Sequence, residues 1–288
     1  MRLFTTLALL MGMVWASPAG ADYTIGKVSA DLSKAEPEAR YWDSVPATEL
    51  SLMAQPMVVP RPKQTTTAQL SVQAVHDRKR LALRLRWKDP ARNEAGRLGE
   101  ASDAVAVEFP VSGGEVPPPV FMGTKDNPVH IFHWRAQYER DRDSGKPTMK
   151  DLYPNMAVDI YPMEFKDHGA APKPGESERD VFSPGRAQGN PQSYSKTGVD
   201  EILAEGFSTS SVQEGHNSVA RSKWADGMWT VVITRDLRSE GGSVLELGKK
   251  SFIGAAVWQG GELEVGSRKC VTMSWTPILI SANAPGQP

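Results

Sequence analysis

The sequence predicts a mainly β protein, an antiparallel β-sandwich with a long irregular insertion and a few short helices. Three observations predict this fold class: apolar residues alternate with polar ones in many short segments, Gly and Pro separate these segments, and strongly helical stretches are few. Many short strands joined by turn residues are typical of two packed sheets. The composition, with 40% hydrophobic residues and a formal net charge of −1, is that of an ordinary folded protein.

Residues 1–21 have the pattern of a secretory signal peptide. Arg2 precedes a short apolar run, and small residues follow up to Ala21. This run is shorter than the roughly 20 apolar residues that a membrane-spanning helix needs. We therefore expect residues 22–288 to form a single mature domain that is periplasmic and has no membrane span.

The clearest strands form a predicted hairpin at residues 68–77 and 79–89. In its second strand the apolar residues fall on one face and the basic residues on the other, so we expect one buried and one solvent-exposed face. The apolar set is Leu81, Leu83, Leu85 and Trp87, and the basic set is Arg84, Arg86 and Lys88. Further strands are predicted over residues 103–111, 129–136, 228–237, 251–258 and 270–278.

A helix is predicted at residues 197–206, where Thr197 can cap the start and Gly206 can end the helix. Residues 140–195 are rich in Pro, Gly and charged residues but carry scattered aromatic residues and methionines. A linker between two domains is one interpretation of this segment. We expect instead a loop-rich insertion that packs over one end of the sandwich as a lid, because a linker would not need apolar residues.

The composition excludes several classes of protein and site. The near-neutral charge argues against nucleic acid as a partner, because a nucleic-acid binder would show a basic face. The single cysteine, Cys270, excludes an internal disulfide, a thiolate-held iron-sulfur cluster and a Cys-x-x-Cys-His haem attachment site. The sequence has no glycine-framed nucleophile motif of a hydrolase, so we predict that the chain is not an enzyme.

The segment PPPVFMGTKDNPVHIFHWRAQYE, residues 117–139, contains the strongest signal for a functional site. In a strand, His130 and His133 point to opposite faces, so the two imidazoles cannot bind one metal. Met122 follows a proline run that restricts the backbone and precedes Gly123, which allows a turn. A thioether is a good ligand for haem iron or cuprous copper, although filling core space is an alternative role for Met122.

Several segments of the chain resemble one protein family. They are YWDSVPATELSLMAQP (41–56), LALRLRWKDP (81–90), DAVAVEFPV (103–111), FMGTKDNPVHIFHWRA (121–136) and YSKTGVDEILAEGFSTSS (194–211). Together with the leader they are similar to the haem b-binding gamma subunits of periplasmic molybdenum enzymes of the dimethyl sulfoxide reductase family. Ethylbenzene, dimethylsulfide, chlorate and selenate enzymes belong to that group, and the similarity covers most of the mature chain.

The resemblance implies a β-sandwich that holds one non-covalent haem b between a methionine and a lysine. Met122 matches the methionine, and Lys196 is the best match for the lysine. Lys125 and Lys146 are rival lysines, but Lys125 is too close to Met122 in the chain to reach the opposite face of a porphyrin. An amine binds iron only when neutral, and burial together with the predicted helix start would favour the neutral form of Lys196.

The resemblance also implies a role in electron transfer. Phe121 and Trp134 are predicted to contact the porphyrin ring. Arginines could pair with its propionates, and the sequence does not choose among Arg135, Arg140 and Arg142. With both axial positions of the iron filled, the subunit would carry electrons without binding substrate. The implied partners are the molybdopterin catalytic subunit and the iron-sulfur subunit of the same complex, and a soluble periplasmic cytochrome.

Two other functions remain open. A carbohydrate- or small-ligand-binding sandwich without haem would use exposed aromatic residues, with candidates Trp42, Trp87 and Trp258. A haem sensor or a cytochrome with histidine ligands would use a histidine in place of the lysine, with candidates His130, His133, His168 and His216.

Overall fold

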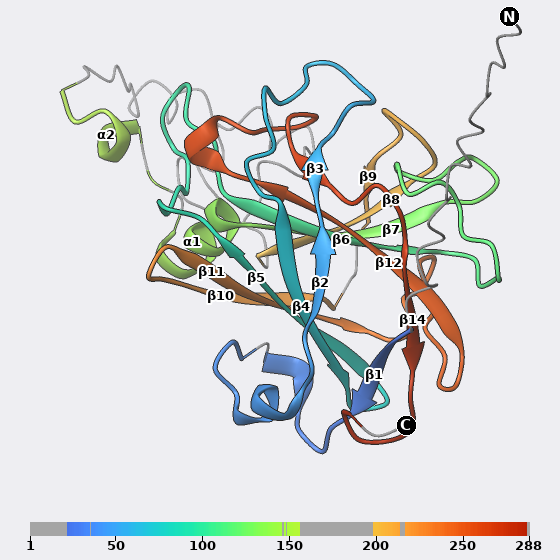
Figure 1. Ribbon diagram of the computed structural model, residues 1–288. Coiled ribbons are helices and arrows are strands. Elements are labelled where there is room, and N and C mark those ends of the chain that lie inside the picture. The colour runs from blue at the N-terminus through green and yellow to red at the C-terminus, as the bar shows by residue number, and fades with distance from the viewer. Residues whose placement is uncertain are drawn as a thin grey trace, which may run out of the picture.

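The computed structural model of the chain describes residues 22–34, 36–145, 147, 149–155, 198–213 and 217–286, and the predicted signal peptide lies outside these ranges. It confirms the mainly β fold. The strands form one continuous curled sheet whose two halves face each other across the core (Figure 1). Most neighbouring strands are antiparallel, whereas β1 (Tyr23–Lys27) pairs in parallel with both β4 (Gln69–His76) and β14 (Thr276–Ile280).

The two halves of the sheet are joined by β1 and β14. In one half the strands are β2 (Thr48–Ser51), β4, β5 (Arg80–Lys88), β10 (Val219–Ala225) and β11 (Met228–Asp236). In the other half they are β6 (Ala104–Pro110), β7 (Val129–Arg135), β8 (Val199–Ala204), β9 (Ser211–Val212) and β12 (Lys250–Trp258). The short strands β3 (Met53–Ala54) and β13 (Cys270–Val271) extend this second half beside β12.

The β4–β5 hairpin forms where the alternating pattern predicts it. In the turn, Asp77 Oδ1 accepts hydrogen bonds from two backbone amides, at 2.8 and 2.7 Å. On β5, Leu83 is buried and Lys88 is exposed, as the alternation predicts. The face of β5 that carries the basic residues is not exposed along its whole length. Ala82 lies on this face and packs in a second small core around Trp42.

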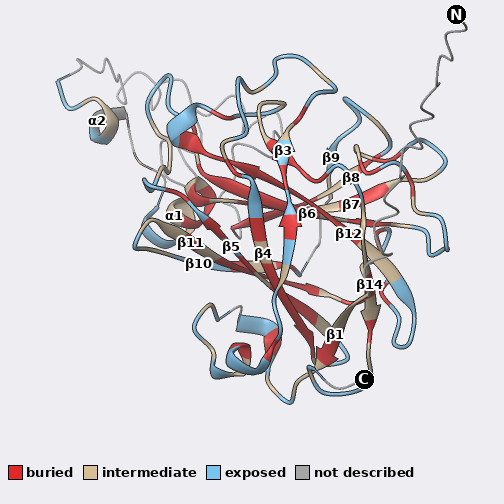
Figure 2. Ribbon diagram, in the orientation of Figure 1, coloured by how far each residue is buried: buried red, intermediate tan, exposed pale blue. Residues whose placement is uncertain are grey.

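Tryptophan side chains fill the space between the two halves of the sheet. The ring centroid of Trp134 on β7 lies 6.2 Å from that of Trp87 on β5 and 5.1 Å from that of Trp229 on β11. Two of the three buried indole nitrogens have polar partners, since Trp134 Nε1 donates to Glu139 at 2.7 Å and Trp229 Nε1 donates to Asp103 at 3.0 Å. Figure 2 shows that the buried residues follow these strands. This cluster determines which face of β7 is internal.

The helix predicted at residues 197–206 is wrong, because the structure has the strand β8 there. β8 pairs antiparallel with β7 over its length, from Val199 opposite Trp134 to Ala204 opposite Val129. Tertiary pairing with a buried strand therefore outweighs the helix preference of the Glu, Leu and Ala residues in this segment. As a result, the chain from Val199 onward belongs to the sheet that carries the histidine segment.

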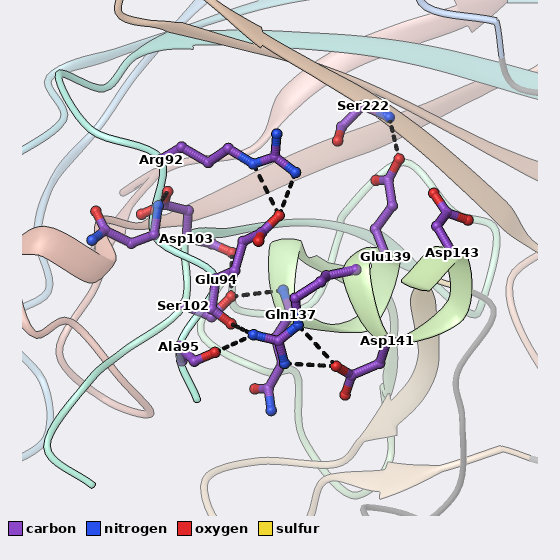
Figure 3. A network of polar contacts seen from close by, with 12 residues as sticks. Arg92, Glu94, Ala95, Ser102, Asp103, Gln137, Glu139, Asp141, Asp143 and Ser222 are labelled. Carbon is purple, nitrogen blue, oxygen red and sulfur yellow. Dashed lines mark hydrogen bonds and ion pairs between the residues drawn. The ribbon is translucent and has the colours of Figure 1, made fainter. Parts of the chain in front are cut away.

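Helix α1 (Ala136–Ser144) follows β7 directly, and the short α2 (Met149–Leu152) follows α1. The start of α1 is held by the neighbouring loop, because the Gln137 amide donates to Ser102 Oγ at 3.0 Å (Figure 3). None of the helices in the described ranges is long and apolar enough to span a membrane. Most of the insertion predicted at residues 140–195 lies outside the described residues, so the lid remains a prediction.

The strand predicted over residues 270–278 is interrupted. β13 and β14 both pair with β12, but residues 272–275 between them leave the ladder. Thr272 compensates for the interruption, since its Oγ1 accepts a hydrogen bond from the Ala255 amide and its own amide donates to the Ala255 carbonyl, both at 3.0 Å. Cys270 at the start of the segment is fully buried, as predicted for an inert thiol.

A substitution on β5 tests the packing of the two halves. We expect Leu83→Ala to lower the free energy of unfolding by about 2–5 kcal/mol, because Leu83 is fully buried in the main core and truncation leaves a cavity. Urea unfolding followed by tryptophan fluorescence measures the change. Lys88→Ala is the matched control on the exposed face of the same strand, with an expected effect within about 0.5 kcal/mol. Equal losses in the two variants would contradict the assigned faces.

Candidate functional site

A cavity of about 540 Å³ lies against the face of β6, β7, β8 and β12 that is turned away from the core. Cavities of about 300–1,000 Å³ with mainly apolar linings are typical of small-molecule and cofactor sites. The apolar side chains that line this cavity include Met57, Val120, Phe121, Ile131, Ile202 and Val212.

Strand pairing arranges the floor of the cavity in three rows of side chains. The middle row is, from β13 to β8, Val271, Ala256, Ala106, His133 and Asp200. The second row contains Glu108, Ile131 and Ile202, and the third contains Trp258 and Arg135. Because the two alanines at the centre are small, the middle of the floor is flat enough for a planar ligand to lie against it.

Met122 lies in the loop between β6 and β7, at the end of the cavity beyond the second row. Its φ of 68° is in the left-handed region, which is uncommon for a residue other than glycine and is concentrated at functional sites. Gly123 also has a positive φ, of 66°, and a Cβ there would lie 2.7 Å from the Asn127 carbonyl oxygen. The Met122 carbonyl accepts a hydrogen bond from the Gly206 amide at 2.8 Å, which ties this loop to the chain after β8.

Charged side chains in the cavity are strongly affected by burial. Burial raises the pKa of Glu108 to about 8, although nearby Lys269 acts to lower it. Burial lowers the pKa of Lys269, and Glu108 opposes that shift. The Lys269 ammonium lies 4.9 Å from the ring centroid of Trp258, within range of a cation–π contact. Within the described ranges, no three His, Cys, Asp or Glu side chains are grouped so that they could hold a metal ion.

His133 is a buried neutral imidazole in the cavity floor. Burial, with Arg135 and Lys269 nearby, lowers its pKa well below the ordinary value. Its ring stacks on Trp258 with a centroid distance of 4.7 Å and an interplanar angle of 27°. The Nε2 atom has no hydrogen-bond partner among the residues that the structure describes, which is an unusual state for a buried polar atom. His130 lies on the other face of β7, which confirms the predicted opposite orientation of the two histidines.

The structure brings some of the predicted site residues together and separates others. Met122 and Phe121 line the cavity. Trp134 lies on the opposite face of β7, fully buried among the tryptophans, so core packing accounts for its position. Lys196 lies outside the described residues. Lys125 is exposed at the surface.

The sequence did not identify Lys269 or Glu108 as cavity residues. Both follow the period-two pattern: Lys269 precedes the buried Cys270, and Glu108 alternates with Val107 and Phe109, which are in the core. That pattern assigns each side chain to the face opposite the core. It does not show that the two faces meet in one cavity, because this depends on the long-range pairing of β12 with β6 and β13.

Comparison with known proteins identifies the family. A family model described as Ethylbenzene dehydrogenase matches residues 39–270, most of the chain. The chain belongs to this family. The match includes the strands of the cavity floor, the Met122 loop and Lys269.

Relatives of this member of the ethylbenzene dehydrogenase family are subunits of larger enzymes, according to their names. A Haloferax mediterranei protein provisionally named as a respiratory nitrate reductase heme subunit (ORF7) is 26% identical, over 96% of this chain and 79% of the relative. The chlorate reductase subunit gamma of Ideonella dechloratans is 28% identical, over 84% and 77%. The dimethylsulfide dehydrogenase subunit gamma of Rhodovulum sulfidophilum is 25% identical, over 88% and 78%.

A solved structure with a similar chain path is a family 9 carbohydrate binding module from Caldicellulosiruptor kristjanssonii in complex with glucose. Its TM-score is 0.44 at 8% sequence identity, and the comparison covers 93% of this chain and 99% of that chain.

The raised pKa of Glu108 predicts a pH-dependent stability. The folded protein keeps a proton on Glu108 up to about pH 8, whereas the unfolded chain loses it near the ordinary pKa of 4.5. This contribution to stability is therefore complete below pH 4.5 and is lost as the pH rises to about 8. We expect the unfolding free energy of the wild type, relative to Glu108→Gln, to fall across this range in urea titrations without added cofactor. A constant difference would show that Glu108 titrates as an exposed carboxyl.

Proposed function

We propose that this chain is a non-catalytic electron-transfer subunit that binds one b-type haem non-covalently in the cavity above β6, β7, β8 and β12. The observation that carries the proposal is the position of Met122, a soft thioether ligand, at one end of a mainly apolar cavity with a flat floor. The names of the relatives support it, since one is named a heme subunit and two are named gamma subunits of chlorate reductase and dimethylsulfide dehydrogenase.

The residues of the cavity fit a haem. Its volume of about 540 Å³ is in the range of cofactor sites, and Ala106 and Ala256 leave room for a planar ring against the sheet. Phe121 and Ile131 pack on the same face and supply an apolar surface. The neutral His133 adds no charge to this surface, and Asp200 is the acidic side chain of the middle row, at its β8 end.

Two protein ligands to the iron are proposed, Met122 and Lys196. Lys196 is proposed from the family resemblance. Gly198, two residues after Lys196, adjoins the start of β8. The other end of β8 is the one that lies next to Met122. Because the described chain forms the strand β8 from Val199, the helix-dipole contribution expected from the sequence does not apply, and burial alone would have to favour the neutral amine. Lys269 is the alternative amine, since it lines the cavity and its pKa is lowered.

When bound, haem supplies a reversible one-electron couple at its iron. The chain's own residues determine how that couple is used. The Met122 thioether and a lysine amine would hold the iron, which would leave no site on it for oxygen or substrate. The alanine floor, Phe121 and Trp258 exclude water from the ring. Such a site suits an electron carrier between the iron-sulfur subunit of a periplasmic molybdopterin enzyme and a soluble cytochrome, reached after export directed by residues 1–21.

The carbohydrate-binding alternative loses the residues on which it depended. Trp42 and Trp87 are buried in the two cores, and Trp258 is buried in the cavity wall, stacked on His133. These three tryptophans therefore do not present exposed rings of the kind that stack on sugars. A histidine ligand remains the second candidate for the haem, because His133 lines the same cavity as Met122.

A serine, histidine and glutamate are close together in the core, but they do not form a hydrolytic site. Ser243 Oγ lies 3.3 Å from His130 Nδ1, and His130 Nε2 lies 3.3 Å from Glu201. Ser243 is fully buried, its amide donates to His130 Nδ1, and its Oγ accepts a hydrogen bond from Arg235 at 2.6 Å. A substrate cannot reach this hydroxyl, which supports a non-catalytic role.

Visible spectra of the reconstituted, reduced protein test the ligands. We expect sharp low-spin bands in the wild type and their loss in both Met122→Ala and Lys196→Ala, because each substitution would remove one of the two proposed ligands. Met57→Ala, which changes another methionine of the cavity lining, and Lys125→Ala, which changes an exposed lysine, are the matched controls and should keep the bands. Loss of the bands in Lys269→Ala or His133→Ala, with Lys196→Ala unchanged, would contradict Lys196 as the ligand. No bands in well-reconstituted wild type would contradict haem binding.

Assembly is tested in the native host. We expect an affinity-tagged chain to co-purify with molybdenum and iron-sulfur subunits, and the isolated chain to unfold at a lower temperature than the complex. Thermal unfolding and metal analysis of the purified material measure both. Recovery of the tagged chain alone, with no loss of thermal stability, would contradict the proposed partners.

A further inference from the structure

The polar groups of the cavity are divided between its two ends. Met122 lies beyond the row of Ile131, and Arg135 lies in the row at the other end. The two rows are four residues apart on β7, or roughly 13 Å at the rise of an extended strand. The Lys269 ammonium lies over Trp258 of that row and also interacts electrostatically with Glu108 in the row next to Met122. Arg135 is therefore the cation that marks the end of the cavity away from the thioether.

Arg135 differs from the two other arginines considered from the sequence. Arg140 binds Asp141 at 2.6 Å and the Ala95 carbonyl, and Arg142 binds Asp143 at 2.8 Å and the Ala220 carbonyl at 2.8 Å. Both are therefore occupied by partners in and around α1, of which Ala95, Asp141 and Asp143 are labelled in Figure 3.

The Arg135 guanidinium has no such anchor. It lies 4.9 Å from the ring centroid of Tyr138, and in the described part of the chain no carboxylate is within ion-pair distance of it. Of the three arginines, Arg135 alone lines the cavity. Its donors are therefore available to a group inside the cavity.

The acidic side chains of the cavity lining are Glu108 and Asp200. Glu108 is in the row next to Met122, and burial keeps it largely protonated at neutral pH. Asp200 lies beside His133 in the middle row, across from the alanines. Arg135 and Lys269 both act to lower the pKa of His133, so both cations are close to this imidazole.

We propose that Arg135 forms a carboxylate-binding subsite at the end of the cavity opposite Met122. The inference rests on the proposed function, and the carboxylates are then the propionates of the haem. Arginine presents a fork of N–H donors that matches a carboxylate, while a lysine acts as a point charge. His133, whose Nε2 has no partner among the described residues, lies two residues before Arg135 on the same face of β7 as a neutral hydrogen-bonding group.

Equilibrium binding of two porphyrins to the mature apoprotein tests the subsite. Haem and its dimethyl ester have the same ring and iron, but the ester lacks the carboxylates. We expect Arg135→Gln to weaken haem binding about 10-fold or more and to leave ester binding within about two-fold, on the scale of one charged hydrogen-bonded contact. Arg135→Lys should weaken haem binding less than Arg135→Gln. Arg140→Gln is the matched control and should leave the ratio of the two affinities unchanged.

The outcomes separate this inference from the proposed function. Equal weakening of haem and ester by Arg135→Gln would show that Arg135 only supports the fold, which overturns the subsite. Binding of both porphyrins with no effect of Arg135→Gln also overturns the subsite and leaves haem binding intact. Failure of the wild type to bind either porphyrin overturns the proposed function, and the inference with it.

Discussion

The burial of Trp134 between the two halves of the sheet is the constraint on which the rest of the structure depends. Because this side chain enters the core, alternation along β7 turns His133 and Arg135 to the outer face. The same parity on β6 and β12 places Ala106 and Ala256 beside them. The cavity is thus the reverse side of the core, and a register shift of one residue would bury its charges and expose the tryptophan.

Local patterns in the sequence predicted the elements whose structure is local. The β4–β5 hairpin, the strands β6 and β7 and the opposite orientations of His130 and His133 follow from period-two alternation and turn residues. The helix predicted at residues 197–206 failed because pairing with β7 is a tertiary effect that propensity does not contain. Lys269 could be assigned to a face but not to the cavity, since its neighbours there come from distant strands.

The chemistry of the cavity is ordered along the strand direction. A thioether lies at one end, a neutral imidazole beside small side chains in the middle, and the Arg135 guanidinium at the other end. An asymmetric ligand with one apolar and one anionic edge has one favourable orientation in such a site. Reversing it would place the anionic edge against apolar side chains and leave the guanidinium unpaired, which is costly in a buried environment.

The two halves of the sheet are connected through β1 and β14, in which Tyr23 pairs with Ile278, 278 − 23 = 255 positions apart. The floor of the cavity similarly needs β12 and β13, which follow the other floor strands by many residues. Loop-closure entropy for such distant pairings must be overcome before the contacts form, so this topology folds slowly. A nascent chain therefore lacks the cavity that would hold a prosthetic group. The group can be incorporated only when nearly the whole polypeptide is available.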